Sequence, residues 1–185
     1  MEPRFTGGCS QTAMERPDII QFKGRSQTVV GPDITVGMEA PDFVVIGQDW
    51  SERRPVAEER GKVLVLAAVT SLDTSVCDRE SRRFNEEAVQ LGEEVRIVVI
   101  SADLPPAQAR WCGAAGVDRV TTLSDSVHVD FGTKYGCLMK EVRLLRRAVF
   151  VVDRQGQVAY SSYMRAIGEE PMYNEVIEAV RSVFR

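Results

Sequence analysis

The sequence predicts an α/β protein with a mixed central sheet flanked by helices. Two apolar runs, residues 63–69 and 95–100, show almost no polar alternation, which is typical of strands covered on both faces. The segment between them carries apolar residues at helical spacing, and two further strand-like runs and a helical stripe close the chain. Strands that alternate with helices and end in a hairpin plus a helix indicate an α/β sandwich.

The composition is that of one folded domain without a strong charge bias. The chain has 185 residues, 44% of them hydrophobic, and a formal net charge of -4, so neither nucleic acid nor a membrane surface is an expected partner. No apolar run approaches the roughly 20 residues of a membrane-spanning helix, and residues 1–17 lack the apolar block of a secretory signal. We therefore expect a disordered tail over residues 1–17, a single domain over residues 18–185 and a cytoplasmic location.

The predicted strands follow from short apolar runs bounded by turn residues. The expected strands are residues 19–23, 26–30, 43–46, 63–69, 95–100, 148–152 and 157–161. A hairpin joins the first pair through Gly24-Arg25, and another joins the last pair through a turn that contains Gly156. Gly47 ends the strand at 43–46, and Val56 is expected to return beside it.

The predicted helices follow from apolar residues at helical spacing and from proline at a helix start. The expected helices are residues 74–91, a segment from Pro105 to Gly113 or Gly116, residues 127–135, and a last helix whose apolar stripe is Met172, Val176, Ile177, Val180 and Val183. We interpret that stripe as core packing rather than a ligand surface. The first helix carries Cys77 and the second carries Cys112.

Cysteines are the candidate reactive groups. Cys9, Cys77, Cys112 and Cys137 are too few and too widely spread for a disulfide-stapled secreted domain. The chain has no C-x-x-C pair and a single histidine, His128, so we expect neither a metal site nor a cofactor. We interpret Cys9 as a tail thiol, Cys137 as structural or incidental, and His128 as a surface residue rather than a base.

Cys77 stands where a buried strand gives way to a helix, and Asp73 or Thr74 could cap that helix. Free first-turn amides and the helix dipole favour a thiolate there. A helix terminus contributes only about 0.3 to 1 kcal/mol, so a cation or several hydrogen bonds must add to it. The candidate cations are Arg79, Arg82, Arg83, Arg146 and Arg147. Sequence spacing does not choose among them, and any one arginine is more often a surface residue.

Several segments together resemble one family, the bacterial thiol peroxidases, which are atypical two-cysteine peroxiredoxins. The segments are residues 70–77, 101–105 and 110–113 and Arg147-Ala148-Val149, within a match over about residues 19–184. The resemblance implies a thioredoxin-like fold, Cys77 as peroxidatic cysteine and Cys112 as resolving cysteine. It also implies that Thr74 orients the thiol and the peroxide, that Arg147 stabilises the thiolate, that thioredoxin is the reductant and that the protein is a homodimer.

The expected chemistry is reduction of hydrogen peroxide and organic hydroperoxides. A thiolate attacks the peroxide, becomes a sulfenic acid and then forms an intrachain disulfide with a second thiol. We expect the first turn around Cys77 to unwind so that the two sulfurs meet. One position departs from the family pattern, because Thr70 stands where proline is usual, and we expect activity to be retained with an altered rate or greater overoxidation.

Two other functions compete with a peroxidase. A thioredoxin-like disulfide oxidoreductase would share the fold, but the absence of C-x-x-C argues against it. A non-enzymatic peroxide sensor would keep an oxidisable Cys77 but turn over slowly, and Thr70 is the best support for it.

Overall fold

The structure is a computed structural model that describes residues 14–184. Eleven strands and five helices are formed within these residues. The strands are β1 (Glu15–Phe22), β2 (Arg25–Val30), β3 (Val45–Ile46), β4 (Glu52–Arg53), β5 (Val63–Ala68), β6 (Val95–Ser101), β7 (Thr121–Ser124), β8 (Leu138–Met139), β9 (Leu144–Leu145), β10 (Ala148–Val152) and β11 (Val158–Tyr163). The helices are α1 (Pro55–Glu58), α2 (Ser75–Leu91), α3 (Pro105–Ala115), α4 (Asp130–Lys134) and α5 (Tyr173–Ser182).

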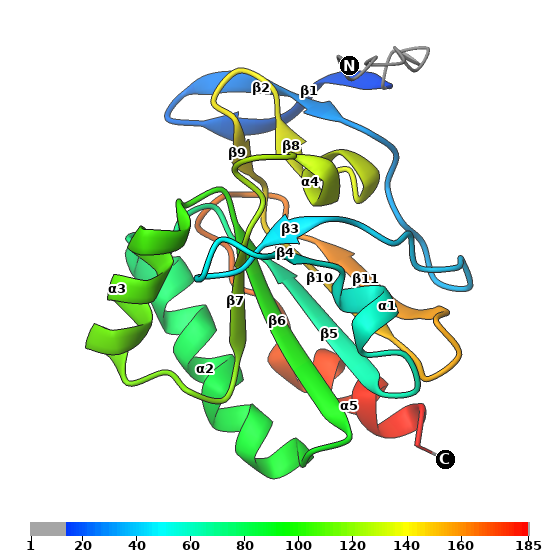
Figure 1. Ribbon diagram of the computed structural model, residues 1–185. Helices are drawn as coiled ribbons and strands as arrows, with labels where there is room; N and C mark the ends of the chain where they lie inside the picture. The colour runs from blue at the N-terminus through cyan, green and yellow to red at the C-terminus, as the bar shows by residue number, and fades with distance from the viewer. Residues whose placement is uncertain (1–13, 185) are drawn as a thin grey trace, which may run out of the picture.

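A seven-stranded mixed sheet in the order β11-β10-β5-β6-β7-β3-β4 forms the centre of the fold (Figure 1). Strands β5, β6 and β7 are parallel and are joined by α2 and α3, whereas β10, β11, β3 and β4 run antiparallel to their neighbours. The predicted mixed sheet flanked by helices is therefore confirmed. The interior positions of β5 and β6 explain why their sequences lack polar alternation.

The two faces of the large sheet pack against different elements because successive side chains of a strand point to opposite sides. On one face, Val65 and Ala67 of β5 belong to a core completed by side chains of α2, α3 and α5. On the other face, Leu66 packs in a second core with the aromatic residues Phe43 and Phe131. Thus α2 and α3, which carry the two candidate cysteines, lie on the same side of the sheet.

A second sheet of four strands, β1-β2-β8-β9, lies at one end of the molecule (Figure 1). The predicted hairpin is present, but its turn is Lys23-Gly24, where both residues have positive φ (48° and 75°), as a type I′ turn requires. Strand β1 also begins earlier than predicted, because Glu15 pairs with Val30. The expected tail over residues 1–17 therefore overlaps the strand at its end, and residues 1–13 lie outside the described part of the chain.

Several short elements differ from the prediction. Strand β4, rather than Val56, returns beside β3. The chain reverses early in a tight turn, in which the Gly47 amide donates to the Ser51 carbonyl, and Val56 lies in α1. Helix α4 begins only at Asp130, because Val129 adopts a left-handed conformation (φ 50°). The strands β7, β8 and β9, with four, two and two residues, were not predicted.

None of the helices within residues 14–184 has the length and apolar character needed to span a membrane.

Candidate active site

Cys77 lies in the first turn of α2, directly after the loop that follows β5. Thr74 is the residue before the helix, in extended conformation, and its hydroxyl donates to the Ser71 carbonyl (2.9 Å). The hydroxyl therefore shapes the loop and does not cap a helix amide, so the predicted capping contact of Thr74 is not formed. Thr74 is exposed, whereas the Cys77 side chain is fully buried.

The loop before Cys77 is fixed by Asp103, which follows β6. One Asp103 carboxylate oxygen accepts from the Ser71 hydroxyl (2.8 Å), and the other accepts from the Leu72 amide (2.8 Å). The Ser101 hydroxyl also donates to Asp103 (2.8 Å). These bonds join the ends of two parallel strands, so the position of the Cys77 helix start depends on the residue pattern at 101–103.

Arg147 supplies the cation at the Cys77 sulfur. Its Nη2 donates to Cys77 Sγ at 3.1 Å, and its side chain is fully buried. The register of the sheet explains the approach, because Ala148 of β10 lies opposite Ala68 at the end of β5 from which the Cys77 loop departs. Arg147 precedes Ala148 and so points to the face that α2 covers.

The other candidate cations have different partners. Arg146 is also buried but points to the opposite face, where it donates to the Gly136 carbonyl (2.7 Å) and pairs with Asp33. The three remaining candidates have exposed side chains that form ion pairs: Arg79 with Glu170, Arg82 with Asp78, and Arg83 with the largely buried Glu87. The general expectation that arginine is exposed is thus wrong for Arg146 and Arg147.

A buried carboxylate shares Arg147 with the sulfur. Glu80, one helical turn after Cys77, forms a close ion pair with Arg147 Nη1, and both side chains are fully buried. Arg147 Nη2 also reaches the Ile167 carbonyl (3.3 Å). The guanidinium is therefore held at both ends of its fork, which orients one N–H toward the sulfur. Sequence reasoning missed Glu80, although its spacing of three residues from Cys77 places both on one helix face.

Cys112 lies in the last turns of α3 and is half-buried. Its Sγ accepts from Gln48 Nε2 (3.4 Å) and contacts Thr122 Oγ1 (3.3 Å) in a surface hollow that Asp49, Arg53 and Asp118 also line. Within residues 14–184 no cysteine is in a disulfide. The structure therefore brings Arg147 to the Cys77 sulfur and places Thr74 directly before α2, the helix that carries Cys77. The sulfurs of Cys77 and Cys112 contact different groups and not each other.

The model of the family described as Redoxin matches residues 35–177. A thiol peroxidase from Bacillus subtilis is 47% identical over 166 residues, which cover 90% of this chain and 98% of that protein. The chain belongs to the thiol peroxidases of the Redoxin family. The resemblance inferred from the cysteine segments is thereby confirmed.

Solved structures of this peroxiredoxin class agree with the fold. A peroxiredoxin-like protein from Aquifex aeolicus superposes with a TM-score of 0.81 at 38% identity, covering 91% of this chain and 99% of that chain. A thiol peroxidase from Chromobacterium violaceum has a TM-score of 0.77 at 19% identity, covering 88% and 95%, and supports the fold alone. The predicted thioredoxin-like fold is confirmed.

Cys137, the third described cysteine of this thiol peroxidase, is in an environment that disfavours its reactive thiolate form. Cys137 is fully buried beside β8, and desolvation raises the pKa of its thiol to about 12. A thiol with such a pKa carries a negligible thiolate fraction at neutral pH, which agrees with its interpretation as a structural residue. Cys9 lies outside the described residues.

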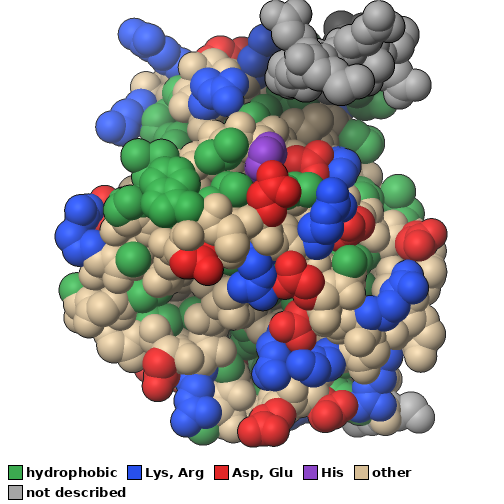
Figure 2. Space-filling view, viewed as in Figure 1, with side chains coloured by type: hydrophobic (Ala, Val, Ile, Leu, Met, Phe, Trp, Pro, Cys, Tyr) green, Lys and Arg blue, Asp and Glu red, His purple; other side chains and the backbone are tan. Residues whose placement is uncertain are grey.

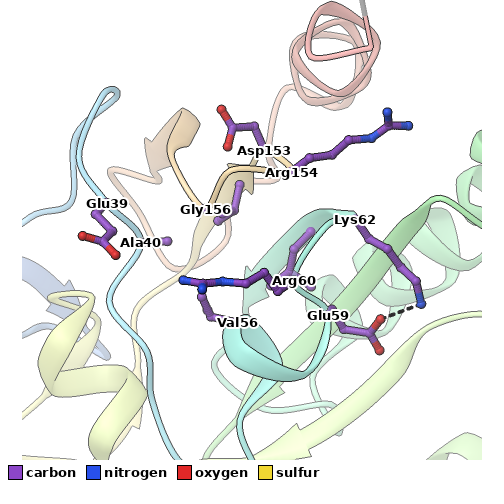
Figure 3. A pocket seen from close by; sticks show the side chains of 11 residues that line it. Glu39, Ala40, Val56, Glu59, Arg60, Lys62, Asp153, Arg154 and Gly156 are labelled. Carbon is purple, nitrogen blue, oxygen red and sulfur yellow. Dashed lines mark hydrogen bonds and ion pairs between the residues drawn. The ribbon is translucent and has the colours of Figure 1, made fainter.

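Other surface features of this family member lie away from the cysteines. A small cavity lined by Arg60, Lys62, Asp153 and Arg154, among others, lies near the end of β5 opposite to the Cys77 loop (Figure 3). On the face shown in Figure 2, basic and acidic side chains are interspersed. His128 is exposed, and its Nε2 lies 3.2 Å from a carboxylate oxygen of Glu52 at the surface.

Proposed function

We propose that this chain reduces hydroperoxides with Cys77 as the peroxidatic cysteine. The observation that carries the proposal is the 3.1 Å contact between Arg147 Nη2 and Cys77 Sγ at the start of α2. A guanidinium and a helix N-terminus both favour the anionic sulfur, and thiolate is the nucleophilic form.

In the first step the Cys77 thiolate attacks the terminal oxygen of ROOH. The O–O bond breaks, the sulfur is oxidised to sulfenic acid, and RO⁻ departs and takes a proton from solvent as ROH. We propose that Arg147, whose Nη2 donates to Cys77 Sγ, stabilises charge at the sulfur and at the attacked oxygen. Thr74 is proposed to orient the peroxide, because its hydroxyl lies three residues before Cys77 at the exposed helix start.

In the second step Cys112 is proposed to resolve the sulfenic acid. Its thiolate attacks the Cys77 sulfur, hydroxide leaves and is protonated to water, and an intrachain disulfide forms. Among residues 14–184, Cys77 and Cys137 are buried, whereas Cys112 is partly exposed to solvent. This exposure supports the assignment of Cys112 as the resolving cysteine. A dithiol protein then returns both cysteines to thiols, and we propose thioredoxin for it.

We also propose a homodimer in a cytoplasmic setting, with hydrogen peroxide and organic hydroperoxides as substrates. The family resemblance supports these expectations, and a reducing compartment would keep the described cysteines as thiols. Light scattering on purified protein measures the dimer, and parallel assays with hydrogen peroxide and cumene hydroperoxide measure the substrate range.

The test combines turnover with mapping of the oxidised cysteines. We expect sustained peroxide consumption coupled to thioredoxin, loss of turnover in Cys77→Ser, and a stable sulfenic acid on Cys77 in Cys112→Ser. Mass mapping of peroxide-treated protein should find a Cys77–Cys112 link within one chain. A single stoichiometric burst without turnover would favour a peroxide sensor instead, and efficient insulin reduction would favour a disulfide oxidoreductase.

A further inference from the structure

One face of α2 holds the carboxyl-terminal part of α3 and the loop that follows it through three polar contacts. Trp111 Nε1 donates to Asp78 Oδ1 (3.0 Å), Arg82 Nη1 donates to the Ala115 carbonyl (2.9 Å), and the Arg119 amide donates to Asn85 Oδ1 (2.7 Å). Residues 78, 82 and 85 are spaced by four and three, so they share one helix face. We refer to Asp78, Arg82 and Trp111 as the α2–α3 clamp.

The members of the clamp support one another. Arg82 Nε binds both carboxylate oxygens of Asp78 (3.1 and 3.0 Å), and the Arg82 guanidinium lies over the Trp111 ring at 6.0 Å from its centroid. Trp111 is only 9% exposed, so its indole N–H relies on Asp78 as hydrogen-bond partner while the clamp is closed. Opening therefore costs several linked contacts rather than one.

The clamp lies directly beside both reactive cysteines in the chain. Asp78 follows Cys77, and Trp111 precedes Cys112. Neighbouring residues on a helix point about 100° apart, so while Trp111 faces α2 the Cys112 side chain faces elsewhere. There its sulfur contacts Gln48 and Thr122. The clamp thus fixes α3 in the orientation that keeps the Cys112 sulfur on its own partners.

We propose that the α2–α3 clamp is a brake on disulfide formation, an inference that rests on the proposed roles of Cys77 and Cys112. For the Cys77 sulfenic acid and the Cys112 thiol to give a disulfide and water, the first turn of α2, the end of α3 or both must unwind, and either movement separates Asp78 from Trp111. While the clamp holds, the sulfenic acid stays open to a second peroxide, which oxidises it to sulfinic acid with release of ROH. The clamp residues are therefore positioning residues that set the ratio of disulfide to sulfinic acid.

The test is Trp111→Phe, which removes the indole N–H and keeps an aromatic ring in the core. We expect the rate constant of disulfide formation to rise about threefold to tenfold, the change expected when one hydrogen bond that breaks before the transition state is absent. The sulfinic acid yield at a fixed peroxide concentration should fall in proportion. Rapid acid quench followed by mass analysis measures both, together with sulfenic acid formation, which should keep its rate.

A second variant tests the clamp without a substitution in the core. Arg82→Gln changes a side chain that is 46% exposed, removes the bond to the Ala115 carbonyl and should speed disulfide formation in the same direction. Arg83→Gln, at the neighbouring position but paired with Glu87 outside the clamp, is the matched control and should leave that rate unchanged. Because general destabilisation would also ease the unwinding of α2 or α3, the melting temperature of each variant is measured beside the rates, and an acceleration that Arg83→Gln does not share is assigned to the clamp.

Two results would overturn the proposal, and they are distinguishable. Disulfide formation that is equally fast or slower in both clamp variants, with the wild-type disulfide present, would overturn the brake alone. A wild-type protein that forms no Cys77–Cys112 disulfide after sulfenic acid formation would overturn the proposed function and the brake with it.

Discussion

Arg147 is shared between two acceptors, the Cys77 sulfur and the Glu80 carboxylate, and this division requires the two-sided fork of arginine. Lysine would keep the charge but offer one ammonium in place of the fork. We expect Arg147→Lys to lower the second-order rate constant with hydrogen peroxide at least about tenfold, within the range for loss of a positioned charge-stabilising donor. Competition kinetics against a peroxidase of known rate measures this constant.

Arg146→Lys is the matched control for that change. Arg146 is the adjacent buried arginine, but it points to Asp33 and the Gly136 carbonyl on the other face of the sheet. This variant should lower stability while the peroxide rate constant stays within about twofold, because no contact of Arg146 reaches the sulfur. Equal losses in both variants would mean that Arg147 acts through the fold and not at Cys77.

Cys137 offers a second measurement at the residue scale. Because burial raises the pKa of its thiol to about 12, we expect no alkylation of Cys137 by iodoacetamide in the folded protein at pH 8. Cys112, which is half-buried, should be alkylated under the same conditions. Peptide mass analysis reads both sites, and rapid labelling of Cys137 in native protein would contradict the burial argument.

At the scale of elements, the junction of β5 and α2 positions the sulfur, and Thr70 lies within it. Thr70 is 2% exposed, and its hydroxyl has no hydrogen-bond partner among residues 14–184. The preceding residue, Val69, continues the strand pairing through its amide bond to the Ile100 carbonyl (2.9 Å) and so suits the position before a proline. The junction therefore tolerates, in geometry, the proline that the family pattern has at this position.

We expect Thr70→Pro to raise the free energy of unfolding by about 1 kcal/mol. The change removes a buried unpartnered hydroxyl and restricts the unfolded chain. For a chain of this size the melting temperature should rise by about 2–4 °C, which calorimetry measures. Thr70→Val removes the hydroxyl alone and separates the two contributions. A lower melting temperature in the proline variant would show that the loop needs the conformational freedom of threonine.

The elements also show what the sequence could predict. Strand β5 and helix α2 were predicted almost to the residue, because an unbroken apolar run and a helical period are local signals. The two-residue strands β8 and β9 were not, because β8 pairs with β2, which is distant in the chain, and β9 pairs in turn with β8. The same limit applies to the site. The residue patterns located Cys77 but left five arginines as candidates for the cation beside its sulfur. The register of β10 beside β5, which brings Arg147 to the sulfur, depends on pairing between distant parts of the chain.

At the scale of the whole molecule, the segments that follow β2 and precede β8 of the small sheet are tied to the large sheet by partly buried polar contacts. Tyr163 of β11 accepts from the Ile34 amide (2.8 Å) and donates to the Tyr135 carbonyl (2.9 Å). Arg146 lies against the Tyr163 ring, 4.1 Å from its centroid, and pairs with Asp33. These contacts lead us to propose that both sheets belong to one folding unit.

One folding unit should unfold in one cooperative transition. We expect tryptophan fluorescence, from Trp50 and Trp111 of the large-sheet region, and alkylation of Cys137, beside the small sheet, to report the same urea midpoint. Cys137 directly precedes β8 and packs in the core on one face of the large sheet, so its labelling reports on the region where the two sheets meet. Labelling of Cys137 at a lower urea concentration than the fluorescence change would show that this region opens before the rest of the fold.

The pH dependence of stability should carry the mark of Asp125, which joins the end of β7 to α4. Its two carboxylate oxygens accept from the Phe131 and Gly132 amides (3.1 and 2.8 Å), yet desolvation by burial outweighs these bonds and raises its pKa to about 7. In the unfolded chain the pKa of this group is about 3.9. Between those values the folded state holds a proton that the unfolded state has lost, so stability falls as pH rises from about 4 to 7 and then levels.

The expected loss is about 4 kcal/mol at about 1.4 kcal/mol per pH unit, and Asp125→Asn should remove it. Other carboxylates, such as Asp33 with its lowered pKa, contribute the opposite slope to both proteins, so the informative quantity is the difference between variant and wild type. Urea unfolding at intervals from pH 4.5 to 8 should show the variant gaining on wild type as pH rises. If the stabilities of variant and wild type instead change with pH in parallel, Asp125 is already ionised across this range. The hydrogen bonds from the Phe131 and Gly132 amides would then outweigh the effect of burial on its pKa.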